Sequence, residues 1–239
     1  MPTESPIHLD EGEVGTAVFL ARPNRFLCIL EIGEQSMEAF VPNPGRMNEI
    51  LFPGKEVYVR KTSAPHRKTS YDLIGVEHDG VLVSLDSNKP NRFMKRLLNQ
   101  HESTLFGEYD TVIPEPPLYG GRADFRLEGV EGTKLIEVKS CTLVQHRRAL
   151  FPDAPTKRGT RHLHDLVMAK QSGLADEVYV VFVIQRPDVK RFAANREMDP
   201  AFADALKEGF DDGLQVYALR TMVKDWHLVL LDSVPVDLV

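Results

Sequence analysis

Residues 178–184 form an uninterrupted apolar run, Val-Tyr-Val-Val-Phe-Val-Ile, with no polar position that would give the segment a solvent-facing side. Most of these residues are β-branched or aromatic, and such residues favour strands. A strand that is apolar on both faces has to be covered on both, as in a sheet flanked by helices. The run therefore predicts a strand at the centre of a mixed α/β domain.

The segments around this run alternate between strand and helix patterns. In one expected helix, Leu163, Leu166, Val167 and Lys170 share a face that is apolar apart from a lysine long enough to reach solvent. Gly173 is expected to end that helix. The fold class predicted for this part is α/β with a mixed sheet. Its other strands are expected near residues 111–114, 122–127, 134–140 and 214–219, and its helices over 160–172 and 200–209.

The first third of the chain has a different pattern. Short segments rich in β-branched and aromatic residues are separated by Gly, Pro and Asn turns, which is typical of successive short strands. A five-stranded OB-like β-barrel fits this spacing and length. We expect residues 1–88 to form the barrel and residues 89–239 to form the α/β domain, which begins with a helix near 91–99. The strands are expected at 14–20, 26–31, 37–41, 56–60, 70–76 and 81–85.

Composition argues against membrane and secreted classes. No apolar run approaches the roughly 18 residues needed to span a bilayer, and the N-terminus lacks the basic and apolar parts of a secretion signal. The only cysteines, Cys28 and Cys141, lie far apart in sequence. They favour two free thiols in a reducing compartment over a disulfide. The expectation is a cytoplasmic protein without a membrane partner.

The net charge of -6 argues against indiscriminate coating of DNA, but the charge is unevenly distributed. Residues 139–170 hold seven Lys or Arg and two acids, whereas residues 197–212 hold six acids and one Lys. A basic side with an acidic back is compatible with a polyanionic partner such as nucleic acid. Solvated charge fluctuation is the alternative interpretation.

The most informative polar pattern is Asp124 followed by Glu137-x-Lys139. Side chains alternate along a strand, so Glu137 and Lys139 share a face, and a hairpin would bring Asp124 to them in one of its two register parities. Two carboxylates suit Mg²⁺ or Mn²⁺, and a lysine beside the metal can orient water and stabilise developing charge. The pattern predicts a catalytic set of Asp124, Glu137 and Lys139, with Asp124 and Glu137 as metal ligands. An ordinary solvated strand face is the alternative.

A Pro-bounded basic stretch follows. Lys157, Arg158 and Arg161 lie close to the expected start of a helix, where backbone N–H groups and arginines favour anions. His162 is expected either to face the metal or to lie at a solvent-exposed helix edge. Asp153 is expected to cap a turn or to contribute to the site.

Two further residues are possible accessories of the site. Gln185 ends the apolar strand and reaches the same cleft or makes a strand-end hydrogen bond. Glu115 lies in a Pro-rich segment and is a further candidate acid.

In the barrel, Arg22, Arg25 and Phe26 form a basic-aromatic cluster, and the turn Asn43-Pro-Gly-Arg-Met47 displays Arg46. Such groups on an OB-like face hold nucleic acid through phosphate contacts and base stacking. Nucleic-acid binding is therefore predicted for Arg22, Arg25 and Arg46, with a structural turn carrying surface arginines as the alternative. The same role is predicted for Lys157, Arg158, Arg161 and His162 in the second domain.

Taken in order, these motifs resemble the sugar fermentation stimulation protein A (SfsA) family over nearly the whole chain. The matching pieces are Arg22-Pro-Asn-Arg-Phe26, Val41-Pro-Asn-Pro-Gly-Arg-Met47, Arg67-Lys-Thr-Ser-Tyr71, Asp86 with Pro90-Asn91, Arg122-Ala-Asp-Phe125, Glu137-Val-Lys-Ser140, Phe151-Pro-Asp-Ala-Pro-Thr-Lys-Arg-Gly159, His162-Leu163, 182–186 and Pro235-Val-Asp-Leu238.

The resemblance implies an N-terminal OB-like domain and a C-terminal PD-(D/E)xK nuclease-like domain, in which Asp124, Glu137 and Lys139 match the nuclease core. It also implies DNA binding and a link to sugar (maltose) metabolism in bacteria. Two hypotheses follow: a DNA-binding protein with a Mg²⁺- or Mn²⁺-dependent nuclease site, or a non-catalytic DNA-binding transcriptional regulator of sugar metabolism on a nuclease scaffold.

Overall fold

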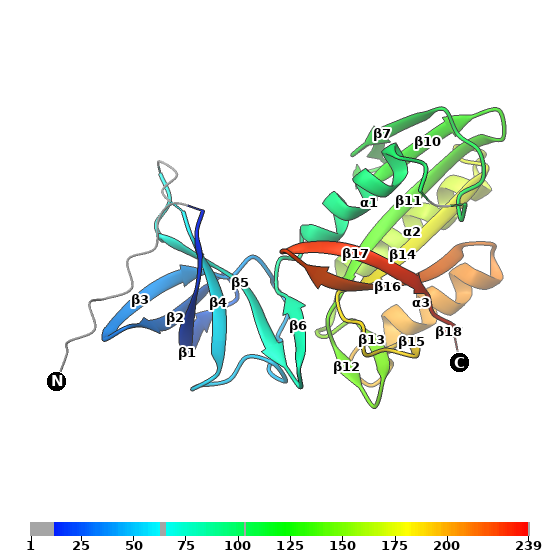
Figure 1. Cartoon of the computed structure of the whole chain (residues 1–239). Helices are drawn as coiled ribbons and strands as arrows, with labels where there is room; N and C mark the ends of the chain where they lie inside the picture. The colour runs from blue at the N-terminus through cyan, green and yellow to red at the C-terminus, as the bar shows by residue number, and fades with distance from the viewer. Residues whose placement is uncertain (1–11, 63–65, 103, 239) are drawn as a thin grey trace. The chain divides into compact units, whose positions relative to one another are not determined.

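The computed structural model describes residues 12–62, 66–102 and 104–238. The chain divides into two compact units, Met1–Asn88 and Lys89–Val239 (Figure 1). Each unit has its own sheet and its own cluster of buried side chains, and each is described by itself.

The N-terminal unit is a closed barrel. Strand β1 pairs with both β2 and β4, β2 pairs with β3, and β5 joins β4 to β3, in parallel with β3. This strand order is that of an OB barrel, as predicted. A sixth strand continues the sheet from β5. The strands are β1 (Val14–Asn24), β2 (Leu27–Ile32), β3 (Gln35–Phe40), β4 (Glu56–Lys61), β5 (Tyr71–His78) and β6 (Val81–Ser84).

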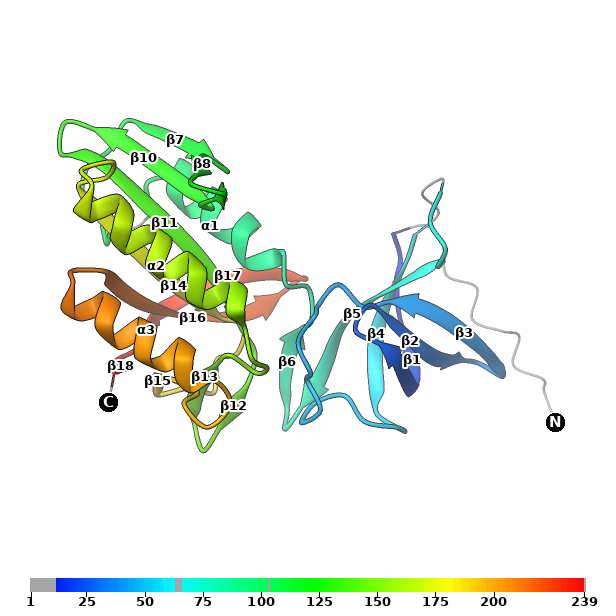
Figure 2. The same ribbon diagram turned by 180° about the vertical axis from the view of Figure 1, so that it is seen from behind.

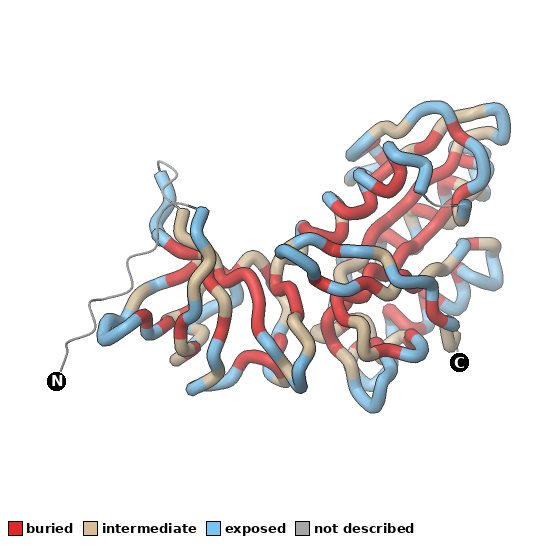
Figure 3. The backbone as a smooth tube through the Cα atoms, in the orientation of Figure 1, coloured by how far each residue is buried: buried red, intermediate tan, exposed pale blue. Residues whose placement is uncertain are grey.

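The barrel core follows from strand alternation. Along β2, Cys28, Leu30 and Ile32 are buried while the residues between them are more exposed, because successive side chains point to opposite faces. Figure 3 shows buried, intermediate and exposed stretches of the chain in this unit. Burial raises the pKa of the Cys28 thiol to about 12, so this cysteine behaves as a small apolar side chain. Both cysteines are buried free thiols, as expected.

The C-terminal unit is built on a six-stranded mixed sheet with the order β17-β16-β14-β11-β10-β7. The apolar run of the sequence is its strand β14, which lies parallel to β11 on one side and to β16 on the other. The remaining neighbours pair in antiparallel fashion. The strands are β7 (Thr111–Pro114), β10 (Phe125–Gly129), β11 (Gly132–Cys141), β14 (Glu177–Ile184), β16 (Gln215–Lys224) and β17 (His227–Ser233).

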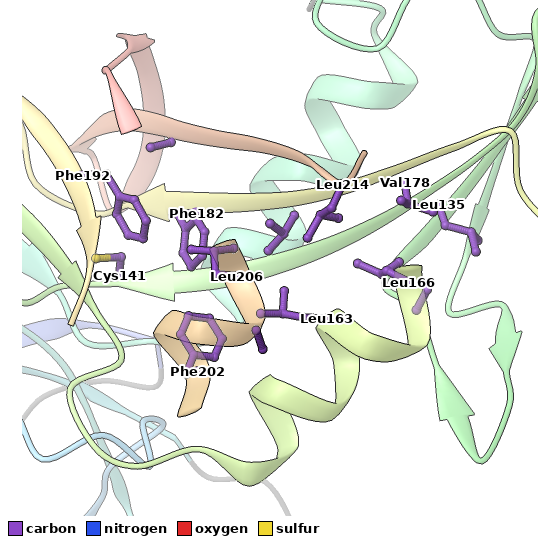
Figure 4. Packing of buried hydrophobic residues seen from close by; sticks show 14 of the residues in the cluster. Leu135, Cys141, Leu163, Leu166, Val178, Phe182, Phe192, Phe202, Leu206 and Leu214 are labelled. Carbon is purple, nitrogen blue, oxygen red and sulfur yellow. The ribbon is translucent and has the colours of Figure 1, made fainter. Parts of the chain in front are cut away.

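Helices cover both faces of this sheet, as a fully apolar β14 requires. Helices α2 (Lys157–Gln171) and α3 (Pro200–Asp211) lie on one face, and α1 (Lys89–Asn99) lies on the other (Figures 1 and 2). Leu163, Leu166, Phe182, Phe202 and Leu206 pack together between α2, α3 and the sheet (Figure 4). Burial of this cluster fixes α2 against β14 and against β11, the strand that carries Glu137 and Lys139.

Several short strands were not expected from the sequence. The strand expected over 122–127 is divided into β9 (Gly121–Arg122) and β10, and β9 pairs with an unexpected strand, β8 (Pro117–Leu118). The others form a four-stranded sheet, β12-β13-β15-β18. Its members are β12 (Val144–Gln145), β13 (Arg148–Phe151), β15 (Arg191–Ala194) and β18 (Val236–Asp237). Within the described residues, no helix is long and apolar enough to cross a membrane.

Candidate metal and nucleic-acid site

The candidate site forms where β11 extends beyond β10. The two strands pair as far as Phe125 opposite Ile136, and just before this pair the Asp124 backbone N–H bonds to the carbonyl of Ile136. Asp124 thereby comes close enough to Glu137 and Lys139 for the charges of both side chains to affect its pKa. On its other edge β11 stays paired with β14 as far as Cys141, so the site lies on a well-supported strand.

Asp124 substitutes for the missing strand partner of β11. Its backbone N–H donates to the carbonyl of Ile136 over 3.1 Å, and its Oδ2 accepts the backbone N–H of Val138 over 2.7 Å. Its Oδ1 accepts a hydrogen bond of 2.6 Å from the side-chain amide of Asn91 in α1. These bonds fix both carboxylate oxygens in position.

The charge of Asp124 is disfavoured in this position. Burial, and then the charge of Glu137, raise its pKa from 3.8 to about 6, against the opposing effects of the Val138 N–H, Lys139 and Asn91. Two carboxylates held this close repel one another, and a bound cation would relieve the repulsion.

Glu137 is buried, with 4% of its surface exposed. Its Oε1 accepts a hydrogen bond of 2.7 Å from Lys139 Nζ and a second from His162 Nδ1. Burial raises the pKa of Glu137, but the hydrogen bond from His162 and the charge of Lys139 outweigh burial, so the pKa lies below its usual value. Glu137 is therefore ionised at neutral pH, and its Oε2 accepts no hydrogen bond from the described residues.

The hydrogen bonds of His162 define its tautomer. Arg158 Nε, which can only donate, donates to His162 Nε2 over 3.3 Å, so a neutral imidazole carries its proton on Nδ1 and donates it to Glu137. The expected solvent-exposed helix edge is wrong for His162, which is 7% exposed. The reason is that Thr156 caps the helix and starts it at Lys157, so His162 lies in the second turn and faces the sheet.

The oxygen ligands of the site suit a hard divalent cation. Asp124 and Glu137 supply two carboxylates, and no group of three Asp, Glu, His or Cys side chains in the described parts of the chain is arranged to hold a metal. Backbone carbonyl groups, water and phosphate oxygens would have to supply the other ligands of a cation bound here.

The cations expected at the start of α2 lie on its exposed side. Lys157, Arg158 and Arg161 are exposed, and Arg161 also approaches Asp165 at 3.5 Å. A side chain at Gly121 would bring its Cβ within 3.3 Å of the Arg161 guanidinium, so Arg161 lies beside the segment that leads into Asp124. The helix therefore presents positive charge next to the carboxylates.

Two of the accessory candidates do not join the carboxylates. Gln185 donates from Nε2 to Ser140 Oγ over 3.0 Å, and Ser140 alternates with Lys139, so Gln185 lies on the opposite face of the sheet. The side chain of Glu115 is 69% exposed and pairs with Arg122 at 2.6 Å. Its backbone N–H is what reaches the site, by donating to the carbonyl of Asp124.

Asp153 is half-buried in the loop before α2 and makes no side-chain hydrogen bond to a described residue. The residue that caps the helix is Thr156, whose N–H donates to Asp199 Oδ2 over 2.7 Å. Sequence reasoning missed the role of Asn91. Its only signal was membership of a family motif, because it lies 33 residues before Asp124.

In the barrel, Arg22 has a structural role that was not predicted. Its guanidinium donates to the carbonyl groups of Asn43, Gly45 and Arg46, and also to that of Arg25, over 2.6 to 2.9 Å. Arg22 therefore ties the 43–46 turn to the end of β1 instead of offering its charge to a ligand. Arg46, which this turn displays, is exposed.

Next to this turn the barrel surface carries an exposed aromatic pair. Phe26 is 44% exposed and stacks on Phe40 with ring centroids 6.2 Å apart. The guanidinium of Arg25 lies over Phe26 at 5.4 Å and that of Arg67 over Phe40 at 5.6 Å. The pair borders a cavity of about 540 Å³, lined by Asn24, Phe26, Leu27, Glu38, Phe40 and 67–69.

Comparison with known proteins matches both units. The family model described as "SfsA N-terminal OB domain" matches residues 20–85, and that described as "Sugar fermentation stimulation protein RE domain" matches residues 88–227. A sugar fermentation stimulation protein homolog from Alkaliphilus metalliredigens is 40% identical over 228 residues, which cover 95% of this chain and 97% of the relative. One from Desulforamulus reducens is 38% identical over 234 residues, covering 98% and 97%.

A solved structure of Pyrococcus furiosus SfsA in complex with Ca²⁺ has the same architecture. It matches with a TM-score of 0.85 and 26% identity, over 98% of this chain and 100% of that one. The fold predicted from the sequence, an OB barrel followed by a nuclease-like α/β domain of the restriction-endonuclease type, is confirmed.

Proposed function

The chain belongs to the sugar fermentation stimulation protein (SfsA) family, and from this premise we propose that it binds nucleic acid and hydrolyses phosphodiester bonds with a divalent cation. The observation that carries the proposal is the convergence of Asp124, Glu137 and Lys139 at the free edge of β11. A buried pair of carboxylates beside a lysine has a clear chemical use in phosphoryl transfer.

The donor set supports Mg²⁺ or Mn²⁺ as the cation. Asp124 and Glu137 would hold it, and the mutual repulsion that raises the pKa of Asp124 would be relieved by its charge. The Pyrococcus furiosus relative was solved with Ca²⁺, which like Mg²⁺ prefers oxygen ligands. When bound, such a cation polarises a phosphate and lowers the pKa of a coordinated water.

The residues of this chain have separate tasks in the proposed reaction. Lys139 holds a proton at Nζ, orients the attacking water and stabilises negative charge that develops on the phosphate. His162 keeps the Glu137 carboxylate ionised and oriented through Nδ1, as a hydrogen-bond partner behind a metal ligand does. Asn91 performs the same task for Asp124 from α1.

Nucleic acid, in particular DNA, is the proposed substrate class. Lys157, Arg158 and Arg161 of α2 are exposed and would attract phosphates; Arg158 reaches His162, the partner of Glu137, and Arg161 lies beside Gly121. In the barrel, the Phe26–Phe40 pair with its two guanidinium groups offers a stacking surface for bases. Arg46 adds an exposed charge to the same unit.

An activity screen tests the proposal. Wild type would be incubated with DNA and RNA in Mg²⁺ or Mn²⁺, alongside Asp124→Ala and Lys139→Ala, with Glu128→Ala on β10 as a matched control away from the site. Cleavage by wild type and Glu128→Ala, reduced at least about 100-fold in the two site variants, is the expected outcome. Equal cleavage by all four proteins would come from contamination and would contradict the assignment.

One observation favours a second candidate, a non-catalytic DNA-binding regulator on the nuclease scaffold. Lys139 pairs with Glu137 at 2.7 Å and His162 donates a hydrogen bond to it, so Glu137 has partners inside the protein that can take the place of a cation. Binding that persists in EDTA, weakens steeply with salt and is never accompanied by turnover would support the regulator.

A further inference from the structure

A second basic surface lies on the four-stranded sheet of the C-terminal unit, away from the residues assigned above. The β12–β13 hairpin and β15, which lie side by side in Figures 1 and 2, border an open cavity of about 690 Å³, which we call the groove. Five of the lining residues are Lys or Arg and one is Glu, in a chain whose net charge is -6. The cations are Arg147, Arg148, Lys190, Arg191 and Arg196.

The strand pairing forces these charges together. Arg148 on β13 lies directly opposite Arg191 on β15 in the parallel register. One step earlier, the backbone N–H of Lys190 donates to the carbonyl of Arg147 over 2.8 Å. Like charges on opposed strand positions are unfavourable, and Arg147 and Lys190, which directly precede the two strands, line the same cavity, so an anion bound there would be stabilising.

The protein supplies only part of the balancing negative charge. Asp237 on β18 approaches Arg191 at 3.1 Å and Arg148 at 3.6 Å, so one carboxylate balances part of the charge of these two arginines. Arg147 and Lys190 are both exposed, and neither side chain has an ion pair or hydrogen bond among the described residues. Arg147 and Lys190 therefore each contribute an uncompensated positive charge to the lining of the cavity.

Two of the strands that border the cavity, β12 and β13, lie in the chain between β11 and α2, the elements that carry Glu137, Lys139 and His162. Strand β12 begins three residues after β11 ends, and β13 leads through a short loop into α2. Eight residues separate Lys139 from Arg147, so the two lie no more than about 29 Å apart. That is less than one helical turn of duplex DNA, which is about 34 Å.

We propose that this groove, bordered by Arg147, Arg148, Lys190 and Arg191, binds the phosphate backbone of the nucleic acid whose scissile phosphate lies at Asp124 and Glu137. The inference rests on the proposed function and specifies where the substrate strand is held. Phosphate is the ligand that fits because it carries closely repeated negative charge and accepts charged hydrogen bonds from arginine.

The test is binding in EDTA, which requires no cleavage. The double variant Arg147→Gln/Lys190→Gln would be compared with wild type and with Lys207→Gln/Lys224→Gln, which removes two exposed lysines elsewhere in the same unit. Each protein would be titrated with single-stranded and duplex DNA and RNA of equal length over a range of salt concentrations.

We expect the groove variant to bind at least one of these nucleic acids about tenfold or more weakly, with a salt slope lower by about 2, while the control keeps wild-type values. The form most affected identifies the bound substrate. Wild-type affinity and slope in the groove variant, or equal losses in the control, would overturn the inference. If wild type binds nucleic acid through the groove but cleaves none of the substrates in Mg²⁺ or Mn²⁺, only the proposed nuclease activity would be contradicted.

Discussion

His162 donates a hydrogen bond from Nδ1 to Oε1 of Glu137, so a residue of helix α2 orients a carboxylate of strand β11. The two residues are 25 apart in sequence, and the helix and strand that carry them pack against each other through the core. Because Arg158 donates to Nε2, the imidazole has one tautomer available while neutral. His162 is therefore a positioning residue for the candidate metal site.

His162→Ala is expected to weaken Mn²⁺ binding by about 10- to 100-fold, the usual effect of losing a hydrogen-bond partner behind a metal ligand. Isothermal titration calorimetry on the metal-free protein would measure the change. His164→Ala, an exposed histidine on the same helix, is the control and should bind Mn²⁺ like wild type. Equal affinity in both variants would show that Glu137 does not depend on His162.

The pKa of Asp124 gives a stability prediction with a definite sign. The folded-state pKa, about 6, lies above the ordinary value of 3.8, so the folded protein binds this proton more tightly than the unfolded chain. The resulting contribution to stability is fully present below pH 3.8 and is lost as pH rises through 6. Between pH 5 and 7.5 the loss is about 1 kcal/mol.

Urea unfolding in EDTA at pH 5 and pH 7.5 would measure this loss. Asp124→Asn removes the titrating group, so its stability should change less over the same interval. The pKa of Glu137 is lowered, so its contribution is lost only below its ordinary value of 4.5, outside this window. An identical pH dependence in wild type and variant would count against an elevated pKa at Asp124.

Site residues that are close together in sequence could be predicted, whereas those that are far apart could not. Glu137 and Lys139 share a strand face by alternation alone, and Asp124 lies within reach of a hairpin. The register was not predictable, because it depends on where β10 starts. Asn91 was not assigned a role, because nothing local links α1 to residue 124.

The fold also has elements that local sequence signals predict and elements that they do not. Turn signals and alternating side chains predicted the barrel and the central strands, because those signals are local. The start of α2 was placed at residue 160, three residues late, because the cap at Thr156 could not be distinguished from a Pro-bounded loop. Strands β13, β15 and β18 were missed because each has at most four residues and is stabilised by partners distant in sequence.

Arg22 and Arg25, which the sequence grouped together, are expected to respond differently to substitution. Arg22→Ala removes a charged donor from four backbone carbonyl groups and should destabilise the barrel by about 2 kcal/mol. Arg25→Ala removes an exposed side chain and should leave stability within about 0.5 kcal/mol of wild type. Thermal unfolding of both variants checks the contrast, and equal losses of stability would contradict the clamp assigned to Arg22.

Phe26→Ala is expected to weaken binding of single-stranded DNA while leaving the fold intact. The ring is 44% exposed, so its removal costs little packing, and stacking of one base on an aromatic ring contributes about 1–3 kcal/mol. The predicted loss of affinity is therefore roughly 5- to 150-fold, measured by fluorescence anisotropy in EDTA. Phe52→Ala, a phenylalanine of the same unit with 45% exposure, is the matched control. If both variants bind like wild type, the Phe26–Phe40 pair does not stack on bases, and the barrel holds nucleic acid by charge alone or not at all.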